Sequence, residues 1–251
     1  MAFELTILGS SAAVPTSKRN LTAHVLNVHE RFFLLDCGEG TQIQIRQNRI
    51  PFAKIDNIFI SHIHGDHVFG LFGLISTFNL LGRTKILNIY AHSDLEIFLS
   101  RHIQFFEKNL AFEIKYHHIN PKKYECVFES DDVEVFTIPL KHRIPCCGYK
   151  FVEKKKTLNI KSQKIKEYNI SVKSIKDIKK GKDFISDEGD IIPNKKLTYP
   201  PYKQRSFAYC TDTAYSEKIV PLIKNVDLLF HEATFASDKK KQAKETLHST
   251  G

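Results

Sequence analysis

The stretch "SHIHGDHVFG" (61–70) carries three histidines and one aspartate within six positions: His62, His64, Asp66 and His67. The whole chain has 12 histidines, so a quarter of them lie in this one loop. The apolar segments "IDNIFI" (55–60) and "VFGLFGLI" (68–75) flank it and indicate a buried strand before the loop and a helix after it. Polar rings crowded between apolar elements destabilise a fold unless each ring nitrogen has a partner.

A metal ion is a partner that fits these side chains, because imidazole nitrogens and carboxylate oxygens are the natural ligands of zinc and manganese. His62 and His64 are two residues apart at a strand end, so an extended backbone points both rings to one side. Asp66 and His67 follow the Gly65 turn and can face a neighbouring position. Two metals about 4 Å apart form a hydrolytic centre for phosphate or acyl substrates. The loop therefore predicts a metal site.

Two other strand ends supply further candidate ligands. His142 lies in "PLKHRIPCCGY" (139–149), directly after one predicted strand, and Asp212 lies in "YCTDTAY" (209–215), directly after another. A single histidine or aspartate at a strand end is usually a turn residue. Together with the histidine loop, these two side chains form a set with metal-binding chemistry.

Composition indicates a soluble globular protein. The 251 residues are 42% hydrophobic and 26% charged. The N-terminus lacks the basic start and cleavage site of a signal peptide, and the longest apolar stretch is too short for a bilayer, so we expect no membrane partner. Five cysteines, an odd number with no Cys-x-x-Cys pair, suit a reducing compartment, and we expect a cytoplasmic protein.

The positive charge of the chain is concentrated in one segment. The formal net charge is +9, and residues 150–205 carry 15 Lys and one Arg against seven acidic residues. The remainder balances, with 21 basic and 21 acidic residues. Because residues 151–205 are rich in lysine and end in "LTYPPYKQR" (197–205), we interpret them as an inserted arm, with a solvated surface loop as the alternative.

Hydrophobic patterning predicts strands that alternate in groups with helices. The predicted strands cover residues 3–9, 23–29, 31–38, 55–62, 86–92, 112–119, 124–130, 133–140, 146–153, 206–212 and 226–233. The predicted helices cover residues 40–48, 66–80, 93–108 and 216–223, and one more begins at residue 238. This order indicates an α/β layered fold with its site along the sheet edges. No Gly-x-Gly-x-x-Gly follows a strand, which argues against a Rossmann fold.

The motifs resemble those of a known family. His-x-His-x-Asp-His is the signature of the metallo-β-lactamase superfamily, and within it the chain resembles ribonuclease Z, a tRNA 3′-processing endonuclease. The supporting stretches follow the family's order: "LLDCGEGTQIQ" (34–44), "ISHIHGDHVFGLFGL" (60–74), "KHRIPCCGYKF" (141–151), "YCTDTAY" (209–215), "HEATF" (231–235) and "HST" (248–250). The resemblance implies one αββα sandwich domain over residues 1–251, two mixed β-sheets face to face with helices outside, and an inserted tRNA-binding arm at 151–205.

The resemblance also implies roles for individual residues. Two Zn²⁺ ions per chain, with Mn²⁺ or another divalent ion as alternatives, would be held by His62, His64 and His142 at one position, by Asp66 and His67 at the other, and by Asp212 at both. Asp66 would also accept a proton from the attacking water, His231 would assist the leaving oxygen or the scissile phosphate, and His248 would lie near that phosphate. Asp36 would orient a ligand imidazole through its free N–H.

The implied reaction is endonucleolytic removal of the 3′ trailer from precursor tRNA. A hydroxide activated by both metals would attack phosphorus, leaving a 3′-hydroxyl on the tRNA and a 5′-phosphate on the trailer. In the family the arm grips the tRNA elbow, and lysines would contact phosphates without reading sequence. The RNA-binding candidates are Lys18, Arg19, Lys154, Lys155, Lys156, Lys173, Lys176, Lys179, Lys180 and Lys182. A homodimer is implied as well.

Three stretches depart from the family pattern. "PTSKRN" (15–20) has Ser17 where many bacterial members have lysine, in a loop that influences discrimination against mature CCA ends, and the arm lacks a Gly-Pro pair. The chain stops at "KETLHSTG" (244–251), whereas members continue to a Gly-His-Phe-Ser segment whose histidine is the last ligand of the second metal. We therefore expect a C-terminally incomplete domain with impaired activity. A small-molecule phosphodiesterase or hydrolase of the same superfamily and a catalytically impaired RNA-binding protein remain as alternatives.

Overall fold

The computed structural model describes residues 2–106 and 109–251. The last two residues of the helix predicted over 93–108 lie outside the described residues. The chain divides into two compact units, one made of Met1–Val152 with Arg205–Gly251 and the other of Glu153–Gln204.

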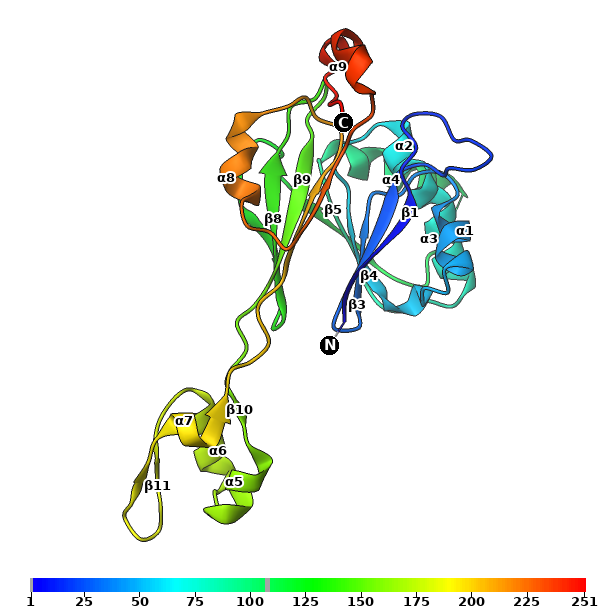
Figure 1. Ribbon diagram of the computed structural model, residues 1–251. Coiled ribbons are helices and arrows are strands. Elements are labelled where there is room, and N and C mark those ends of the chain that lie inside the picture. Colours follow the sequence, from blue (N-terminus) through cyan, green and yellow to red (C-terminus); the bar gives the residue numbers. More distant parts are fainter. Residues whose placement is uncertain (1, 107–108) are drawn as a thin grey trace. The chain divides into compact units, whose positions relative to one another are not determined.

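Two β-sheets form the centre of the larger unit, and Figure 1 shows helices on their outer faces. The first sheet has the order β1-β2-β3-β4-β5-β6, formed by β1 (Phe3–Gly9), β2 (Ala23–Val28), β3 (Arg31–Leu35), β4 (Ile55–Phe59), β5 (Leu87–Ala91) and β6 (Ile114–His118). The second has the order β15-β14-β9-β8-β7, formed by β7 (Cys126–Glu129), β8 (Val133–Pro139), β9 (Cys147–Glu153), β14 (Ser206–Cys210) and β15 (Leu228–His231). Both sheets are mixed: β1–β2–β3 and β9–β14 pair antiparallel, whereas β3–β4–β5–β6 and β14–β15 pair parallel.

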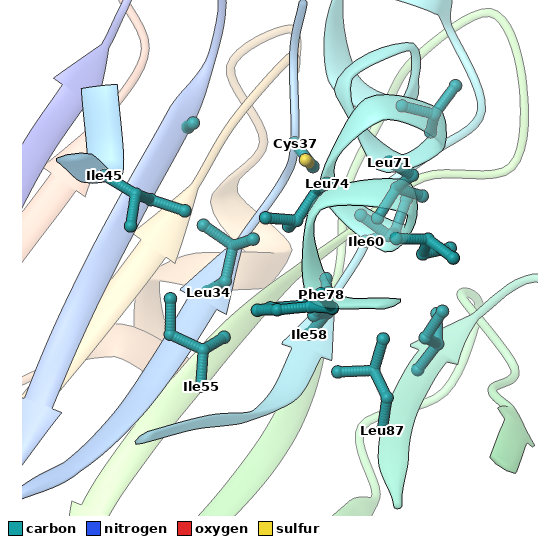
Figure 2. Close-up of a cluster of buried hydrophobic side chains, with 14 of the residues drawn as sticks. Leu34, Cys37, Ile45, Ile55, Ile58, Ile60, Leu71, Leu74, Phe78 and Leu87 are labelled. Carbon is teal, nitrogen blue, oxygen red and sulfur yellow. The ribbon is translucent and has the colours of Figure 1, made fainter. Parts of the chain in front are cut away.

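Alternation of side chains along the strands explains the layers. In β3, Phe33 and Leu35 point into the core between the two sheets, and Leu34 between them points into the core under the helices. In β14, Phe207 and Tyr209 likewise lie between the sheets. Figure 2 shows the helix-side core, in which Leu34 lies among buried side chains from the neighbouring strands and helices. An αββα sandwich results, as the sequence predicts.

The helices of the larger unit lie in the connections between strands, except the last two, which follow the last strand. They are α1 (Thr41–Gln47), η1 (Phe52–Lys54), α2 (Gly65–Val68), α3 (Gly70–Leu80), α4 (Asp94–Phe106), η2 (Glu217–Ile219), α8 (Val220–Ile223), η3 (Ser237–Lys239) and α9 (Lys240–Thr246). The single helix predicted over 66–80 is two helices, because the N–H of Gly70 donates to the carbonyl of Cys37 at 2.9 Å and so leaves the helical ladder. A Cβ at position 70 would lie 2.0 Å from the Gly38 carbonyl oxygen, so only glycine permits this approach.

The smaller unit has a hydrophobic core of its own. Its elements are β10 (Asn159–Ile160), α5 (Ser162–Glu167), α6 (Val172–Lys179), β11 (Phe184–Ile185), β12 (Ile191–Ile192), α7 (Asn194–Leu197) and β13 (Thr198–Tyr199). Strand β10 pairs with β13 and β11 pairs with β12, both antiparallel. Ile170, Ile178, Ile192 and Leu197 are buried together between these elements. The lysine-rich segment is therefore folded around apolar residues and is not an unstructured loop.

Candidate metal centre

The histidine loop lies at the end of β4, where the first sheet meets the turn at residues 36–38. The N–H of Cys37 donates to the carbonyl of His67 at 2.8 Å, which joins this turn to α2. His62 is buried, with 1% of its surface exposed, and His67 is fully buried. The loop thus presents its rings at one edge of the sheet, as expected from the position of the motif at a strand end.

Four side chains from three segments bring ligand atoms together. His62, His64, His142 and Asp212 each offer one ligand atom, and these four atoms lie within 4.8 Å of one another. Nδ1 of His64 lies 2.9 Å from Nε2 of His62 and 3.3 Å from Nε2 of His142. The Asp212 carboxylate is 3.6 Å from Nε2 of His62 and 3.9 Å from Nε2 of His142.

A second group shares the same aspartate. Nε2 of His67 lies 3.4 Å from the Asp66 carboxylate and 3.6 Å from the Asp212 carboxylate. This Nε2 atom is fully buried and has no hydrogen-bond partner among the described residues. The Asp66 carboxylate also accepts a hydrogen bond from the backbone N–H of Ala13 at 2.9 Å. Asp212 therefore lies between two sets of side chains.

Asp36 holds the His67 ring from behind. The buried Asp36 carboxylate accepts hydrogen bonds from Nδ1 of His67 at 2.9 Å, from the Tyr209 hydroxyl at 2.7 Å and from the Ser61 backbone N–H at 2.7 Å. Asp36 has a φ of 55°, a left-handed conformation that aspartate tolerates better than most residues. With its Nδ1–H given to Asp36, His67 aims its Nε2 atom at Asp66 and Asp212.

Two more rings have the same arrangement. Nδ1 of His62 lies 3.0 Å from the Ser61 hydroxyl, which itself donates to Asp36, so the ring is the donor in that pair. Nδ1 of His142 lies 3.3 Å from the Leu247 carbonyl, which can only accept. Both rings thus keep the Nε2 lone pair for a ligand. Metal-ligating histidines almost always donate their other N–H in this way.

The protonation states agree with this assignment. Burial is the main cause that lowers the pKa of His62 to about 2, and burial also lowers the pKa values of His64 and His142, so these three rings are neutral. Burial would lower the pKa of His67, but the neighbouring carboxylates, Asp36 foremost, raise it well above its usual value. Burial would raise the pKa of Asp66, but the charged His67 ring beside it brings it down to about 2. Three neutral imidazoles, ionised carboxylates and a His67 ring whose proton a cation would displace are a donor set suited to a divalent metal. The residues present fit a metal.

Glu232 organises the other side of the centre. One carboxylate oxygen accepts from the N–H groups of Thr213 and Ser249, both at 3.0 Å, and from Nδ1 of His248 at 2.9 Å. The other accepts from the N–H and the hydroxyl of Thr234 at 2.8 and 2.7 Å. Burial would raise the pKa of Glu232, but these hydrogen bonds, led by that of His248, lower it overall.

His248 consequently faces the shared aspartate. Its Nε2 atom lies 3.9 Å from the Asp212 carboxylate, and its ring packs at 5.1 Å from the ring of His142. The hydrogen bond to Glu232 is the largest cause that raises the pKa of His248. An imidazole that holds a proton more strongly than usual beside the candidate ligands is suited to contact an anionic oxygen.

His231 lies in an adjoining hollow. Nδ1 of His231 donates to the Glu232 carbonyl at 2.8 Å. A cavity of about 320 Å³ is lined by His231, Arg19 and Asp212 among others. A second cavity of about 600 Å³ is lined by Asp66, His142, Arg143, Asp212 and His248 among others, and the two cavities share Asp212.

The remaining sequence candidates are lysines. Lys18 is exposed on the loop that also carries Arg19. The arm candidates belong to the smaller unit: Lys154, Lys155 and Lys156 precede β10, Lys173, Lys176 and Lys179 lie on α6, and Lys180 and Lys182 follow it. Lys182 forms an ion pair with Asp177 at 3.1 Å.

The sequence analysis did not single out three residues of the centre. Glu232, Tyr209 and Ser61 each lie inside a motif quoted above, but only their contacts reveal what they hold. The position of Glu232, directly after a histidine at the end of a predicted strand, was the feature of the sequence that could have indicated its role.

Fold comparison defines the class. The chain superposes on the metallo-β-lactamase fold protein YhfI from Bacillus subtilis with a TM-score of 0.64 and 17% identity, covering 98% of this chain and 76% of that one. With two mixed sheets and the histidine–aspartate cluster at their edge, the protein is of the metallo-β-lactamase fold, and its cluster could hold a divalent metal.

Sequence comparison gives the family. A family model described as "Anti-Pycsar protein Apyc1" matches residues 3–250. A protein named Ribonuclease Z from Bacteroides thetaiotaomicron is 47% identical over 248 residues, which are 99% of this chain and 78% of that protein. The crystal structure of human tRNase Z, short form, matches with a TM-score of 0.73 and 27% identity, covering 98% of this chain and 84% of the other. The chain belongs to the ribonuclease Z family.

Proposed function

We propose that this chain is a metal-dependent endoribonuclease that removes the 3′ trailer from precursor tRNA, leaving a 3′-hydroxyl on the tRNA and a 5′-phosphate on the trailer. The observation that carries this proposal is the pair of ligand groups around Asp212 in a chain 47% identical to a ribonuclease Z. A shared carboxylate between two imidazole-containing groups is the usual arrangement for hydrolysis of phosphodiesters with two metals.

The proposed cofactor is two zinc ions, one held by His62, His64 and His142 and one by Asp66 and His67, with Asp212 reaching both. Support comes from the Nε2 atoms of His62, His67 and His142, each of which faces the centre while Nδ1 has another partner. When bound, the metals would lower the pKa of a water molecule and neutralise phosphate charge.

None of the helices in residues 2–106 and 109–251 has the length and apolar character that crossing a membrane requires.

The protein groups around the ligands have complementary roles in this proposal. Asp66 accepts the proton of the attacking water, and the N–H of Ala13 holds its carboxylate in place. His248, fixed by Glu232, contacts the scissile phosphate. His231 assists the leaving 3′-oxygen, and its Nδ1 bond to the Glu232 carbonyl leaves Nε2 for that role.

In this proposal the lysines of the arm bind phosphates of the tRNA. The unit Glu153–Gln204 has 14 lysines against seven acidic residues. Replacing Lys173, Lys176 and Lys180 by glutamine should weaken tRNA binding and flatten its dependence on the logarithm of salt concentration by about two units. Three exposed lysines of the larger unit, Lys85, Lys122 and Lys123, provide the matched control. Equal slopes for both triple variants would exclude the arm as the RNA-binding surface.

A homodimer is part of the proposal. Helices α3 and α4 contact each other and expose large apolar side chains, among them Leu80 with 87% and Phe105 with 79% of their surface accessible. Exposed apolar surface of this kind favours association with another protein surface. Phe105→Glu together with Leu80→Glu should convert a dimer to a monomer in light scattering, whereas Val172→Glu, an exposed apolar residue on α6, should not.

A cytoplasmic location is proposed from the cysteines. All five are free, and four of them are buried in the larger unit. Buried unpaired thiols suit a reducing compartment.

The decisive experiment incubates the purified chain with a precursor tRNA that carries a 3′ trailer and with bis(p-nitrophenyl) phosphate. We expect trailer release with a 3′-hydroxyl on the tRNA, abolished by His64→Ala and retained in the exposed control His118→Ala. Hydrolysis of the small phosphodiester without cleavage of the tRNA would instead support a small-molecule phosphodiesterase. Salt-sensitive tRNA binding without any product would support a catalytically impaired RNA-binding protein.

A further inference from the structure

The two cavities at the centre meet at the shared aspartate. Asp212, Ala12 and Thr234 line both of them, while His231 lines only the smaller cavity and His142 lines only the larger. A polynucleotide whose scissile phosphate lies at Asp212 must therefore place the nucleotide on one side in the smaller cavity and that on the other side in the larger.

Each cavity has one arginine in its lining. Arg19 lines the smaller cavity and Arg143 the larger. Neither guanidinium has an ion pair or a side-chain hydrogen bond within residues 2–106 and 109–251, although carboxylates lie in both linings. Arg143 is exposed and lines the same cavity as His248. An uncommitted guanidinium at the rim of a cleft that receives a polyanion is suited to bind a phosphate.

The direction of the strand follows from the role given to His231, and this step rests on the function proposed above. His231 serves the leaving 3′-oxygen, which belongs to the tRNA body, and it lines the smaller cavity. The tRNA body then extends from Asp212 into the smaller cavity. The first nucleotide of the trailer extends into the larger cavity, where Arg143 lies.

We propose that Arg143 binds the phosphate that follows the first trailer nucleotide, one phosphate downstream of the cleaved bond. The contact is to backbone alone, so it holds trailers of any sequence and distinguishes them by length. A trailer of one nucleotide has no such phosphate, whereas trailers of two or more nucleotides have it. The cavity of about 600 Å³ has room for a nucleotide beside the metal ligands.

The test combines substrate truncation with substitution. Cleavage of precursor tRNAs with trailers of one, two and eight nucleotides is measured as kcat/KM for the wild type, Arg143→Ala and Arg143→Lys. Lys141→Ala is the matched control, because Lys141 is an exposed cation of the same loop that lines neither cavity. Arg143→Ala should reduce kcat/KM about 5- to 30-fold more for the two- and eight-nucleotide trailers than for the one-nucleotide trailer.

The outcomes separate the inference from the proposed function. A loss caused by Arg143→Ala that is the same for all three trailers overturns the inference while the wild-type cleavage still supports the function. Intermediate losses with Arg143→Lys, and the same wild-type ranking of trailers in Lys141→Ala, are the expected pattern. A wild type that cleaves none of the three substrates overturns the proposed function, and the inference with it.

Discussion

Glu232 provides the strictest test of how the centre is held together. Its carboxylate receives five hydrogen bonds from four residues in three separate segments of the chain: Thr213, Thr234, His248 and Ser249. Thr213 directly follows Asp212, so the same carboxylate fixes the loop of a metal ligand and the ring of His248.

The magnitude follows from the donors that each substitution leaves without an acceptor. Glu232→Ala removes the acceptor of three backbone N–H groups, those of Thr213, Thr234 and Ser249. Breaking a buried charged network of this kind costs about 3–5 kcal/mol of unfolding free energy. Glu232→Gln keeps one oxygen for three donors and can lose as little as the Thr234 N–H bond, so about 1–3 kcal/mol is expected.

Activity should fall further than stability alone explains. Residues that orient metal ligands typically change metal affinity or activity 10- to 100-fold when replaced. We expect Glu232→Gln to lie in that range and Glu232→Ala to exceed it, for precursor tRNA and for bis(p-nitrophenyl) phosphate alike, because the defect is at the centre and not in RNA binding. Glu217→Gln, an exposed glutamate beyond the same loop, is the control.

The assay pairs urea unfolding with kcat/KM for both substrates at saturating zinc. A folded Glu232→Ala protein with activity within about twofold of the wild type refutes the reasoning, because the five bonds would then have no consequence for the ligands. A defect confined to tRNA would also contradict it.

Three further predictions concern the metal, the support of His67 and a buried histidine. Dialysis against a chelator should lower the melting temperature and zinc should restore it, and mass spectrometry after dialysis should find two metals per chain; one or none would contradict the proposed pair of sites. Asp36→Asn should weaken metal retention 10- to 100-fold in a chelator competition, and unchanged retention would contradict the role of the His67–Asp36 bond. His24 is fully buried without a partner for either ring nitrogen in the described structure, and burial lowers its pKa to about 4. The His24 ring binds a proton below pH 6.5 in the unfolded chain but only below about pH 4 in the folded chain. The free energy of unfolding therefore decreases by about 3 kcal/mol as the pH falls from 6.5 to 4. His24→Leu should remove this loss, and parallel pH–stability curves for wild type and variant would refute the assignment.

Local patterns in the sequence are enough to predict the sheets. Each strand predicted outside residues 151–205 is present, because alternation over five or more residues, or a continuous buried run, identifies a strand without knowledge of its neighbours. The arm lacks this information. Its strands have two residues each, and its core gathers Ile170 from a loop, Ile178 and Leu197 from two helices and Ile192 from a strand. The spacing of these apolar residues follows neither the helical nor the strand period, so it does not predict the fold of the arm.

Within the centre, too, residues that lie close in the sequence were predictable, whereas residues joined only by tertiary contacts were not. His62, His64, Asp66 and His67 are visible in the sequence because a short loop places them side by side. Glu232 accepts from residues 17 and 19 positions away, so its importance exists only after folding has brought those segments together. A motif can indicate which residue types bind a metal, whereas the hydrogen bonds that aim them depend on tertiary contacts.

The residues proposed to bind RNA and the centre proposed to cleave it carry opposite charges. The centre concentrates the carboxylates Asp36, Asp66, Asp212 and Glu232, which by themselves repel a phosphate. The cations that we propose to bind RNA are the lysines of the arm and Arg19 and Arg143 on the cavity linings. Two divalent cations would offset the four negative charges of these carboxylates and so remove the repulsion at the centre. We therefore expect the chain without metal to bind tRNA but to disfavour the scissile phosphate at the centre, so that this phosphate enters once the proposed metals are bound.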